Sequence, residues 1–245
     1  SFDLRAFFFN SLDTGLFVTV DKPPVGLWVQ VLSVWIFGYS GWALLMPQAL
    51  AGVFSVALLY WLVYRTFGAK AAFIAALVLA VSPISVATNR NNTMDSQLVF
   101  TSLLAALAIS FAAERGQLRW LIACAILVGI GFNIKMLQAY MVLPAFYLLY
   151  FIAPPIAWWK RILHLGLATL ILVVISLSWA VIVDLTPTDQ RPFIGSSTDN
   201  TVMELIAGHN GLRRLGMLAN LFSDQGPPPI QSQPNNPPQS NQPPN

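Results

Sequence analysis

Charged residues are scarce in this sequence and carry little net charge. Only 9% of the 245 residues are charged, with 13 basic and 10 acidic side chains and a formal net charge of +3. Nucleic-acid binding needs a concentrated basic surface, whereas the Lys and Arg residues here are dispersed along the chain. The sequence therefore predicts no nucleic-acid partner.

The motifs by which soluble enzymes bind nucleotides or zinc are also missing. The sequence has no Gly-x-Gly-x-x-Gly, no P-loop, no His-Glu-x-x-His, no cluster of Cys and His, and no nucleophile elbow. Cys124 is the only cysteine, so a disulfide within the chain is excluded, and its apolar surroundings predict a packing role. A soluble nucleotide-sugar donor is therefore not supported.

Hydrophobic residues, by contrast, make up 56% of the chain. Six apolar runs have roughly the length that a membrane crossing requires. They are Pro47–Tyr64, Ala71–Ala87, Ser96–Ala113, Trp120–Ile134, Leu137–Ala153 and Leu163–Val183, of which the fourth is short. We expect an all-α, polytopic transmembrane bundle of about six spans in the cell (plasma or inner) membrane.

A shorter run precedes these six and has a different pattern. Apolar residues recur at helical spacing between Val25 and Phe37 and include Trp28 and Trp35, while Gly26, Gln30 and Ser33 gather elsewhere. A short, amphipathic, Trp-bearing helix is expected to lie in the membrane interface rather than to cross it.

The short connections predict the orientation, because Lys and Arg are retained on the cytoplasmic side. Alternate loops carry basic pairs: Arg65 with Lys70, Arg115 with Arg119, and Lys160 with Arg161. If these loops are cytoplasmic, nearly all other charged residues lie on the outer face, which suggests a site there.

The chain is thus expected to have four parts. Residues 1–46 form an extracytoplasmic loop with the interfacial helix, and residues 47–183 form the transmembrane core. Residues 184–222 form a second extracytoplasmic loop with a short helix near 202–207. Residues 223–245 are rich in Pro, Asn and Gln, a composition typical of a disordered tail.

The first polar cluster lies just before the interfacial helix. Pro23 and Pro24 stiffen the backbone behind Lys22, which could hold a lipid phosphate, while Asp21 could bind a sugar hydroxyl or orient the lysine. The alternative is an ordinary interfacial lysine whose ammonium reaches water.

The second cluster joins the second and third runs and contains Arg90, Asn92 and Asp95. Arg90 and Asn92 are candidate substrate-binding residues. Asp95 precedes an apolar helix, so it is either a helix N-cap or a carboxylate that binds the acceptor or acts as a general base.

Two further clusters fall on the same predicted outer side. Lys135, Gln138 and Tyr140 lie where the fourth and fifth runs meet, and an ionisable residue between such runs is a functional candidate. Arg191 lies in the loop after the last run; His209, in the same loop, is a candidate base or simply a solvated residue.

Four motifs in this order resemble a known family. DKPPVGLW, RNNTMDS, NIKMLQAYMVLP, and RPFIGSS followed by HNGLRRL look like the bacterial branch of the protein O-mannosyltransferase and aminoarabinose-transferase-like membrane glycosyltransferases of the C-type fold. The similarity extends over most of residues 2–215.

The resemblance implies an enzyme that transfers a sugar, mannose-like or pentose, from a polyprenyl-phosphate donor. The acceptor would be a protein, lipid or glycan on the extracytoplasmic face, and the anomeric centre would be inverted. Lys22 would neighbour the donor phosphate, and Asp95 would assist a catalytic acid of the first external loop. That acid and the first crossing are expected to precede Ser1, and the family's later crossings are missing, so we expect the chain to be a fragment.

The residues leave some alternatives open. A divalent cation could bridge a carboxylate and the phosphate, but no spacing requires one, so no metal or other cofactor is assigned. A transporter or flippase of a lipid-linked sugar would also need phosphate-binding charges, although transporters more often place polar residues at mid-membrane. A non-catalytic membrane subunit is the third interpretation.

Overall fold

The computed structural model describes residues 3–13 and 15–207, and in this part of the chain the regular structure is helical apart from two isolated β-bridges. The predicted all-α fold class is therefore confirmed. The elements are α1 (Leu4–Phe9), α2 (Pro24–Phe37), α3 (Gly41–Val81), α4 (Pro83–Asn89), α5 (Asp95–Arg115), α6 (Leu118–Lys135), the 3₁₀ segment η1 (Met136–Val142), α7 (Leu143–Ile152), α8 (Trp158–Leu185) and α9 (Val202–Glu204).

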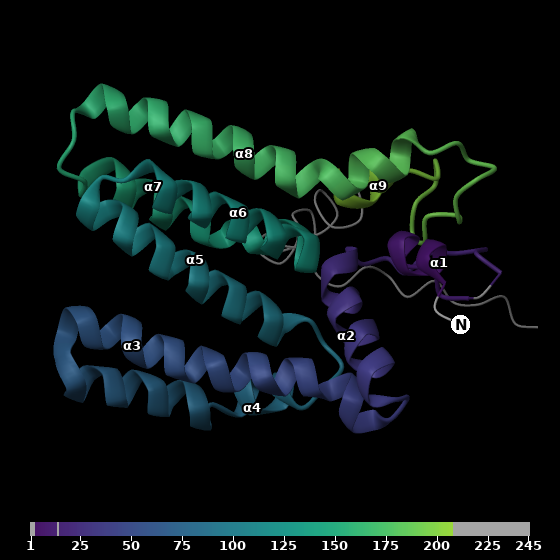
Figure 1. Cartoon of the computed structure of the whole chain (residues 1–245), viewed down its shortest axis with the longest axis horizontal. Helices are drawn as coiled ribbons and strands as arrows, with labels where there is room; N and C mark the ends of the chain where they lie inside the picture. Colours follow the sequence, from purple (N-terminus) through teal and green to yellow (C-terminus); the bar gives the residue numbers. More distant parts are fainter. Residues whose placement is uncertain (1–2, 14, 208–245) are drawn as a thin grey trace, which may run out of the picture.

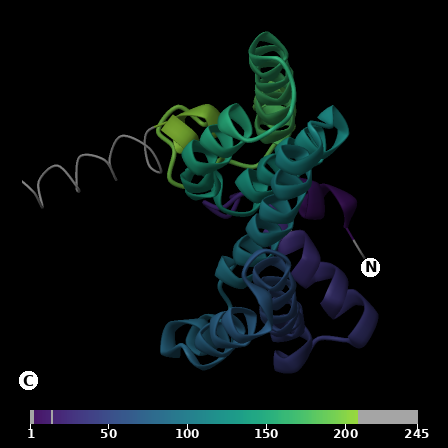
Figure 2. The same ribbon diagram turned by 90° about the vertical axis from the view of Figure 1, so that its left-hand side faces the viewer.

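The long helices run side by side along the molecule (Figure 1). α8 packs on α6, α6 on α5, and α5 on α3, and this order extends from one side of the bundle to the other. The view along the helices in Figure 2 shows the same order, with α8 and the α3 hairpin at opposite edges. α2 runs across the end of the bundle at which α5 begins and α6 ends.

Four helical stretches of the described chain are long and apolar enough to cross a membrane: Gly41–Val81, Asp95–Arg115, Leu118–Ile152 and Trp158–Leu185. Two of them contain a break in the helix. Gly68 has φ 79° and lies between the first and second predicted runs, and Met136 has φ 46° and lies between the fourth and fifth. All six predicted runs are thus mainly helical, although Ser82 interrupts the second run and the fifth begins in η1, and the first two runs form one hairpin.

Small residues let α5 and α6 approach closely. Ala105, Ala108 and Ala112 of α5 are buried in one cluster with Cys124 and Val128 of α6. Close backbone approach at small residues is the usual basis of helix association in membranes. Cys124 is only 4% exposed, in agreement with its predicted packing role.

α2 buries its polar and small side and exposes its apolar side. Gly26, Gln30 and Ser33 are buried, and the Ser33 hydroxyl donates to the Ala43 carbonyl at 2.5 Å, whereas Trp35 and Ile36 are 68% and 65% exposed. This inverted distribution suits a helix that packs on a bundle and faces lipid, and the interfacial position of α2 stays a prediction.

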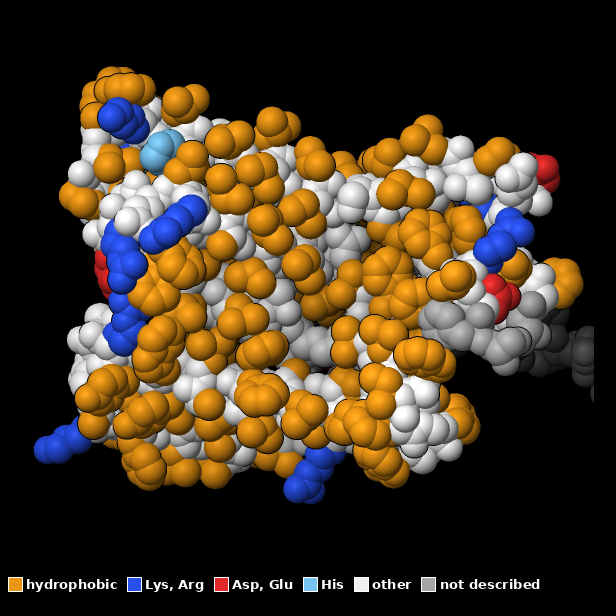
Figure 3. All heavy atoms as spheres, in the orientation of Figure 1, with side chains coloured by type: hydrophobic (Ala, Val, Ile, Leu, Met, Phe, Trp, Pro, Cys, Tyr) orange, Lys and Arg blue, Asp and Glu red, His pale blue; other side chains and the backbone are white. Residues whose placement is uncertain are grey.

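Basic residues gather at the end of the bundle opposite α2. The turn at Gly68, the end of α5 and the start of α8 meet there, and Figure 3 shows a group of Lys and Arg side chains at this edge. Arg65 binds Glu114 at 2.7 Å, and its guanidinium lies 4.2 Å from the centroid of the Phe111 ring. The three basic loops identified in the sequence therefore share one end of the molecule.

Candidate functional site

Asp95 and Lys135 form an ion pair at the end of the bundle near α2. Asp95 is the first residue of α5 and Lys135 is the last residue of α6, and Lys135 Nζ donates to Asp95 Oδ1. Their side chains are 30% and 26% exposed, so the pair is partly open to solvent. Each charge also has the sign that its helix end favours. Met94 is the N-cap of α5, so the alternative that Asp95 serves as the N-cap is wrong.

The backbone around Lys135 is held firmly. Asn133 is buried and its side-chain amide donates to the carbonyls of Gly129 at 3.1 Å and Ile175 at 2.9 Å, which ties α6 to α8. Met136 then has a positive φ of 46° with a ψ of −134°, a strained conformation that costs a non-glycine residue on the order of 1–3 kcal/mol. The chain turns away at this point, which leaves the Lys135 side chain beside Asp95.

Lys22 and Asp21 form a second ion pair, immediately before α2. Lys22 Nζ lies 3.3 Å from Asp21 Oδ2, with the side chains 38% and 33% exposed. The Lys22 carbonyl accepts a hydrogen bond of 3.1 Å from the Asn10 side chain, and Pro23 is the N-cap of α2. The lysine backbone is thus fixed while its ammonium group stays accessible.

The other predicted residues of these clusters lie outside the two ion pairs. Arg90 and Asn92 are exposed in the turn between α4 and α5, and Gln138 is exposed in η1. Tyr140 is partly buried, with its ring centroid 5.0 Å from that of Phe132. The structure does not bring these four side chains into the two ion pairs.

Arg191 is bound within the protein. Its guanidinium donates to the carbonyls of Val183 at 2.6 Å and Asn200 at 2.7 Å and to Asp184 at 3.1 Å, and its side chain is 3% exposed. Asp184 also accepts from the backbone N–H of Val202, at 2.7 Å, at the start of α9. These contacts give Arg191 a role in folding the loop after α8. His209 lies outside the described residues, as do 208–222 of the predicted loop and the predicted tail 223–245.

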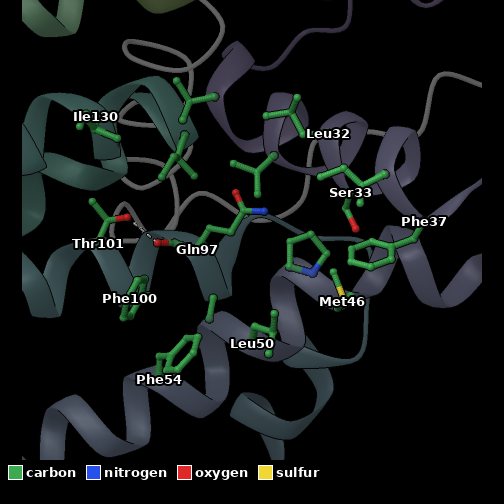
Figure 4. Close-up of a pocket in the computed structure, with 16 residues that line it drawn as sticks. Leu32, Ser33, Phe37, Met46, Leu50, Phe54, Gln97, Phe100, Thr101 and Ile130 are labelled. Carbon is green, nitrogen blue, oxygen red and sulfur yellow. Dashed lines mark hydrogen bonds between the residues drawn. The ribbon is translucent and has the colours of Figure 1, made fainter.

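A large apolar cavity lies between α2, α3, α5 and α6, with a volume of about 480 Å³. Its walls include Leu32, Phe54, Phe100 and Ile130, and Figure 4 shows the Gln97 amide among these apolar side chains. The amide nitrogen donates weakly to the Gly26 carbonyl at 3.4 Å, and the amide oxygen is buried without a partner among the described residues. Sequence reasoning missed this cavity, although Gln97 and Thr101, one turn apart in an apolar run, were a visible signal.

Asp95 lines a different cavity, between α3, α4 and α5, and of the described residues neither Lys22 nor Arg90 lines it. Lys22, Arg90 and Asp95, three of the site residues predicted on the outer face, therefore do not share this cavity. Among the described residues, no three His, Cys, Asp or Glu side chains are grouped so that they could hold a metal ion.

Comparison with known proteins decides the family. Residues 21–179 match the family model described as dolichyl-phosphate-mannose-protein mannosyltransferase. The chain belongs to this mannosyltransferase family. The matched region begins at Asp21, contains Lys22, Asp95 and Lys135, and ends before Arg191.

Members of the mannosyltransferase family and related transferases are similar over much of this chain. A Bacillus subtilis protein named "Putative mannosyltransferase YycA" is 51% identical over 209 residues, which cover 85% of this chain and 30% of that protein. The undecaprenyl phosphate-alpha-4-amino-4-deoxy-L-arabinose arabinosyl transferase of Edwardsiella ictaluri is 28% identical over 168 residues, covering 66% of this chain and 30% of the relative. This chain thus spans about 30% of the length of these curated relatives.

The fold of this chain is similar to that of a solved structure. The crystal structure of ArnT from Cupriavidus metallidurans bound to undecaprenyl phosphate superposes with a TM-score of 0.55 at 25% identity, covering 67% of this chain and 31% of that one. Together with the four apolar helical stretches, the family identifies a multi-pass protein of the inner (plasma) membrane.

Proposed function

We propose that the protein containing this chain is a glycosyltransferase that moves a sugar from a polyprenyl phosphate to a hydroxyl acceptor on the extracytoplasmic face. The observation that carries the proposal is the Asp95–Lys135 pair, a partly exposed carboxylate beside an ammonium at the end of an apolar bundle. Placing ionisable residues in such apolar surroundings costs free energy, and residues of this kind usually mark a functional site. The mannose-type donor in the family's description and the arabinose-type donor of the Edwardsiella relative support a lipid-linked sugar.

The cavity between α2, α3, α5 and α6 suits the prenyl chain of the donor. Its volume of about 480 Å³ and its walls of Leu, Ile, Phe and Val side chains favour a flexible hydrocarbon. The undecaprenyl phosphate bound to the Cupriavidus ArnT supports a ligand of this chemistry. Lys22 is the residue we assign to the phosphate, because it stands on a fixed backbone before α2 with an accessible ammonium.

The proposed reaction is a single displacement at the anomeric carbon. The bond from this carbon to the phosphate oxygen breaks, and its electron pair leaves with the polyprenyl phosphate. An acceptor oxygen forms the new bond from the opposite side, which inverts the centre, and its proton passes to a carboxylate. Asp95 is our candidate for the proton acceptor; Lys22, Lys135 and Arg90 would stabilise the negative charge on the departing phosphate.

The test uses membranes that carry the full-length protein. They are incubated with polyprenyl phosphates bearing labelled mannose or labelled 4-amino-4-deoxyarabinose, and the label that leaves the lipid is measured. We expect release from one of these donors, and Lys22→Ala should lower its rate at least about a hundredfold, because one charge contact to a leaving group contributes about 2–4 kcal/mol.

Lys160→Ala is the matched control, since Lys160 is an exposed lysine at the opposite end of the bundle, and its rate should stay within about twofold of the wild type. If label crosses the bilayer while still attached to lipid and is never released, the protein is a transporter and the proposal is wrong.

A further inference from the structure

A second cavity, of about 260 Å³ and more polar than the first, lies between α3, α4 and α5, where Leu79, Ile84 and Val99 supply the apolar part of its wall. Most of its lining residues carry a hydroxyl, an amide or a carboxylate, and Asp95 is one of them. The neutral polar members are Ser55, Ser82, Ser85, Thr88, Asn89 and Ser96. So many polar side chains around one space are unusual in a bundle whose larger cavity is lined almost entirely by apolar side chains.

The cavity adjoins the apolar one across a single helix contact. Ala51 and Gln97 line the apolar cavity, whereas the next residue of α3, Gly52, and the preceding residue of α5, Ser96, line the polar one. The two spaces are therefore separated by the α3–α5 contact. A hydrocarbon chain on one side and a polar ligand on the other would be kept apart by it.

The hydrogen bonds of the lining residues leave groups available for a ligand. The hydroxyls of Ser55 and Thr88 donate to carbonyls of their own helices, Ala51 at 2.7 Å and Ile84 at 2.9 Å, and so retain lone pairs that can accept. Ser96 is 3% exposed, and within the described part of the chain its Oγ has no partner. A buried polar atom without a partner is destabilising, and a ligand that hydrogen-bonded to it would remove this cost.

The wall of the cavity depends on a residue without a side chain. A Cβ at Gly52 would lie 2.4 Å from both Cγ and Nδ2 of Asn89, so a larger residue here would displace the amide. Asn89 Nδ2 in turn lies within 3.4 Å of Ser85 Oγ. Because Gly52 has no side chain, Asn89 packs against α3 at this point, and Asn89 and Ser85 both line the cavity.

The chemistry of the lining selects a neutral, hydroxyl-bearing ligand. Among the described residues no Lys or Arg lines the cavity, so an anionic ligand would find no cationic partner in its wall. An alkyl chain would leave the polar atoms unpaired, whereas sugar hydroxyls both donate to a carboxylate and accept from serine. A volume of about 260 Å³ lies just below the range of about 300–1,000 Å³ typical of drug-sized ligands, as expected for a single ring.

We infer that this cavity is the acceptor subsite and that the acceptor is a neutral sugar ring or similar polyol, with a hydroxyl directed at Asp95. The acceptor role rests on the proposed function, and the inference adds to that function the chemical class of the acceptor. It makes Ser96 a specificity-determining residue.

The experiment measures binding of methyl α-D-mannopyranoside to the purified full-length protein by saturation-transfer NMR, with glucuronate as the anionic counterpart. We expect the neutral glycoside to bind and glucuronate not to bind. Ser96→Val and Ser85→Val should each weaken glycoside binding at least about tenfold, since each removes a hydrogen bond and adds bulk.

Ser110→Val is the matched control, because Ser110 lies on the same helix but donates to Ala106 far from the cavity, and it should bind as the wild type does. Thermal unfolding midpoints verify that each variant is folded. Wild-type binding by both cavity variants, or equal binding of glucuronate, would overturn the inference.

Donor cleavage is measured on the same preparations and separates the two proposals. If the glycoside binds as expected while no label leaves any polyprenyl phosphate, the cavity is a sugar site and the proposed transfer is wrong. If label is released but neither cavity variant alters glycoside binding, the transfer stands and the acceptor subsite lies elsewhere.

Discussion

Asp95 and Lys135 are individual residues whose charges neutralise each other. Such a pair can stabilise the fold, take part in sugar transfer, or do both. Exchanging the two charges separates these roles. Asp95→Lys and Lys135→Asp alone should each destabilise the protein by about 1–2 kcal/mol, because each places like charges together in a partly buried position. The double exchange should recover part of this loss but not all, since each charge would then oppose its helix dipole.

Transfer should not recover with stability. The exchanged protein should release labelled sugar at least about a hundredfold more slowly than the wild type, because its carboxylate would project from α6 instead of α5. Thermal unfolding in detergent and the donor-cleavage assay measure the two properties. Near-normal transfer by the double variant would mean that the pair serves stability alone.

Glu204 is the described residue whose carboxyl group provides the clearest pH prediction. The Thr198 hydroxyl and the backbone N–H groups of Asp199, at 2.8 Å, and Thr198 donate to it, which lowers its pKa from 4.5 to about 2. A lowered pKa stabilises the folded loop above pH 4.5, and this stabilisation is lost as the pH falls through about 2. Hydrogen exchange of the segment 198–204 should therefore show the same protection at pH 7 and at pH 5, after correction for the intrinsic exchange rate.

Glu204→Gln should reduce this protection at pH 7, because the charge that holds the three donors is removed. Glu114→Gln, at the opposite end of the bundle, should leave the protection of the loop unchanged. Equal protection in wild type and Glu204→Gln would show that the carboxylate does not hold the loop.

At the scale of elements, the N-terminal segment and the loop after α8 form one cap. Thr19 N–H donates to the Phe193 carbonyl at 2.9 Å, and Gly195 N–H donates to Thr19 Oγ1 at 3.1 Å. A Cβ at Gly195 would lie 2.5 Å from the Thr19 carbonyl oxygen, a backbone atom that cannot rotate away. Gly195→Ala should therefore destabilise the protein by about 1–3 kcal/mol.

Gly166→Ala is the control for this change. Nothing lies within 4 Å of a Cβ at Gly166 in α8, so the substitution should be neutral or stabilise the helix by up to about 1 kcal/mol. Thermal unfolding midpoints compare the two variants. A Gly195→Ala protein as stable as Gly166→Ala would mean that the cap does not contribute to the fold.

The length and periodicity of the hydrophobic runs predicted most of the helices. They did not predict which helices contact one another. The run Trp120–Ile134 corresponds to α6 because apolar length is a local property. The pairing of Asp95 with Lys135 was not predicted, because it depends on the start of α5 packing beside the end of α6. The position of Arg191 in the outer loop predicts a ligand residue, whereas its partners in the structure are mostly backbone carbonyls, which no pattern of side chains indicates.

At the scale of the whole molecule, the proposal requires the basic end and the Asp95 end to face opposite sides of the membrane. Lys70 is exposed two residues after the turn at Gly68, and Asn92 is exposed in the turn between α4 and α5, so single cysteines at these positions report the orientation. The background is a full-length protein with Cys124→Ala and all other cysteines removed. A membrane-impermeant maleimide should label Asn92→Cys on intact cells and Lys70→Cys only after the cells are permeabilised, because positively charged loops are retained in the cytoplasm. Labelling in the reverse order would place Asp95 and Lys135 in the cytoplasm, where a lipid-linked donor presented on the outer leaflet could not reach them.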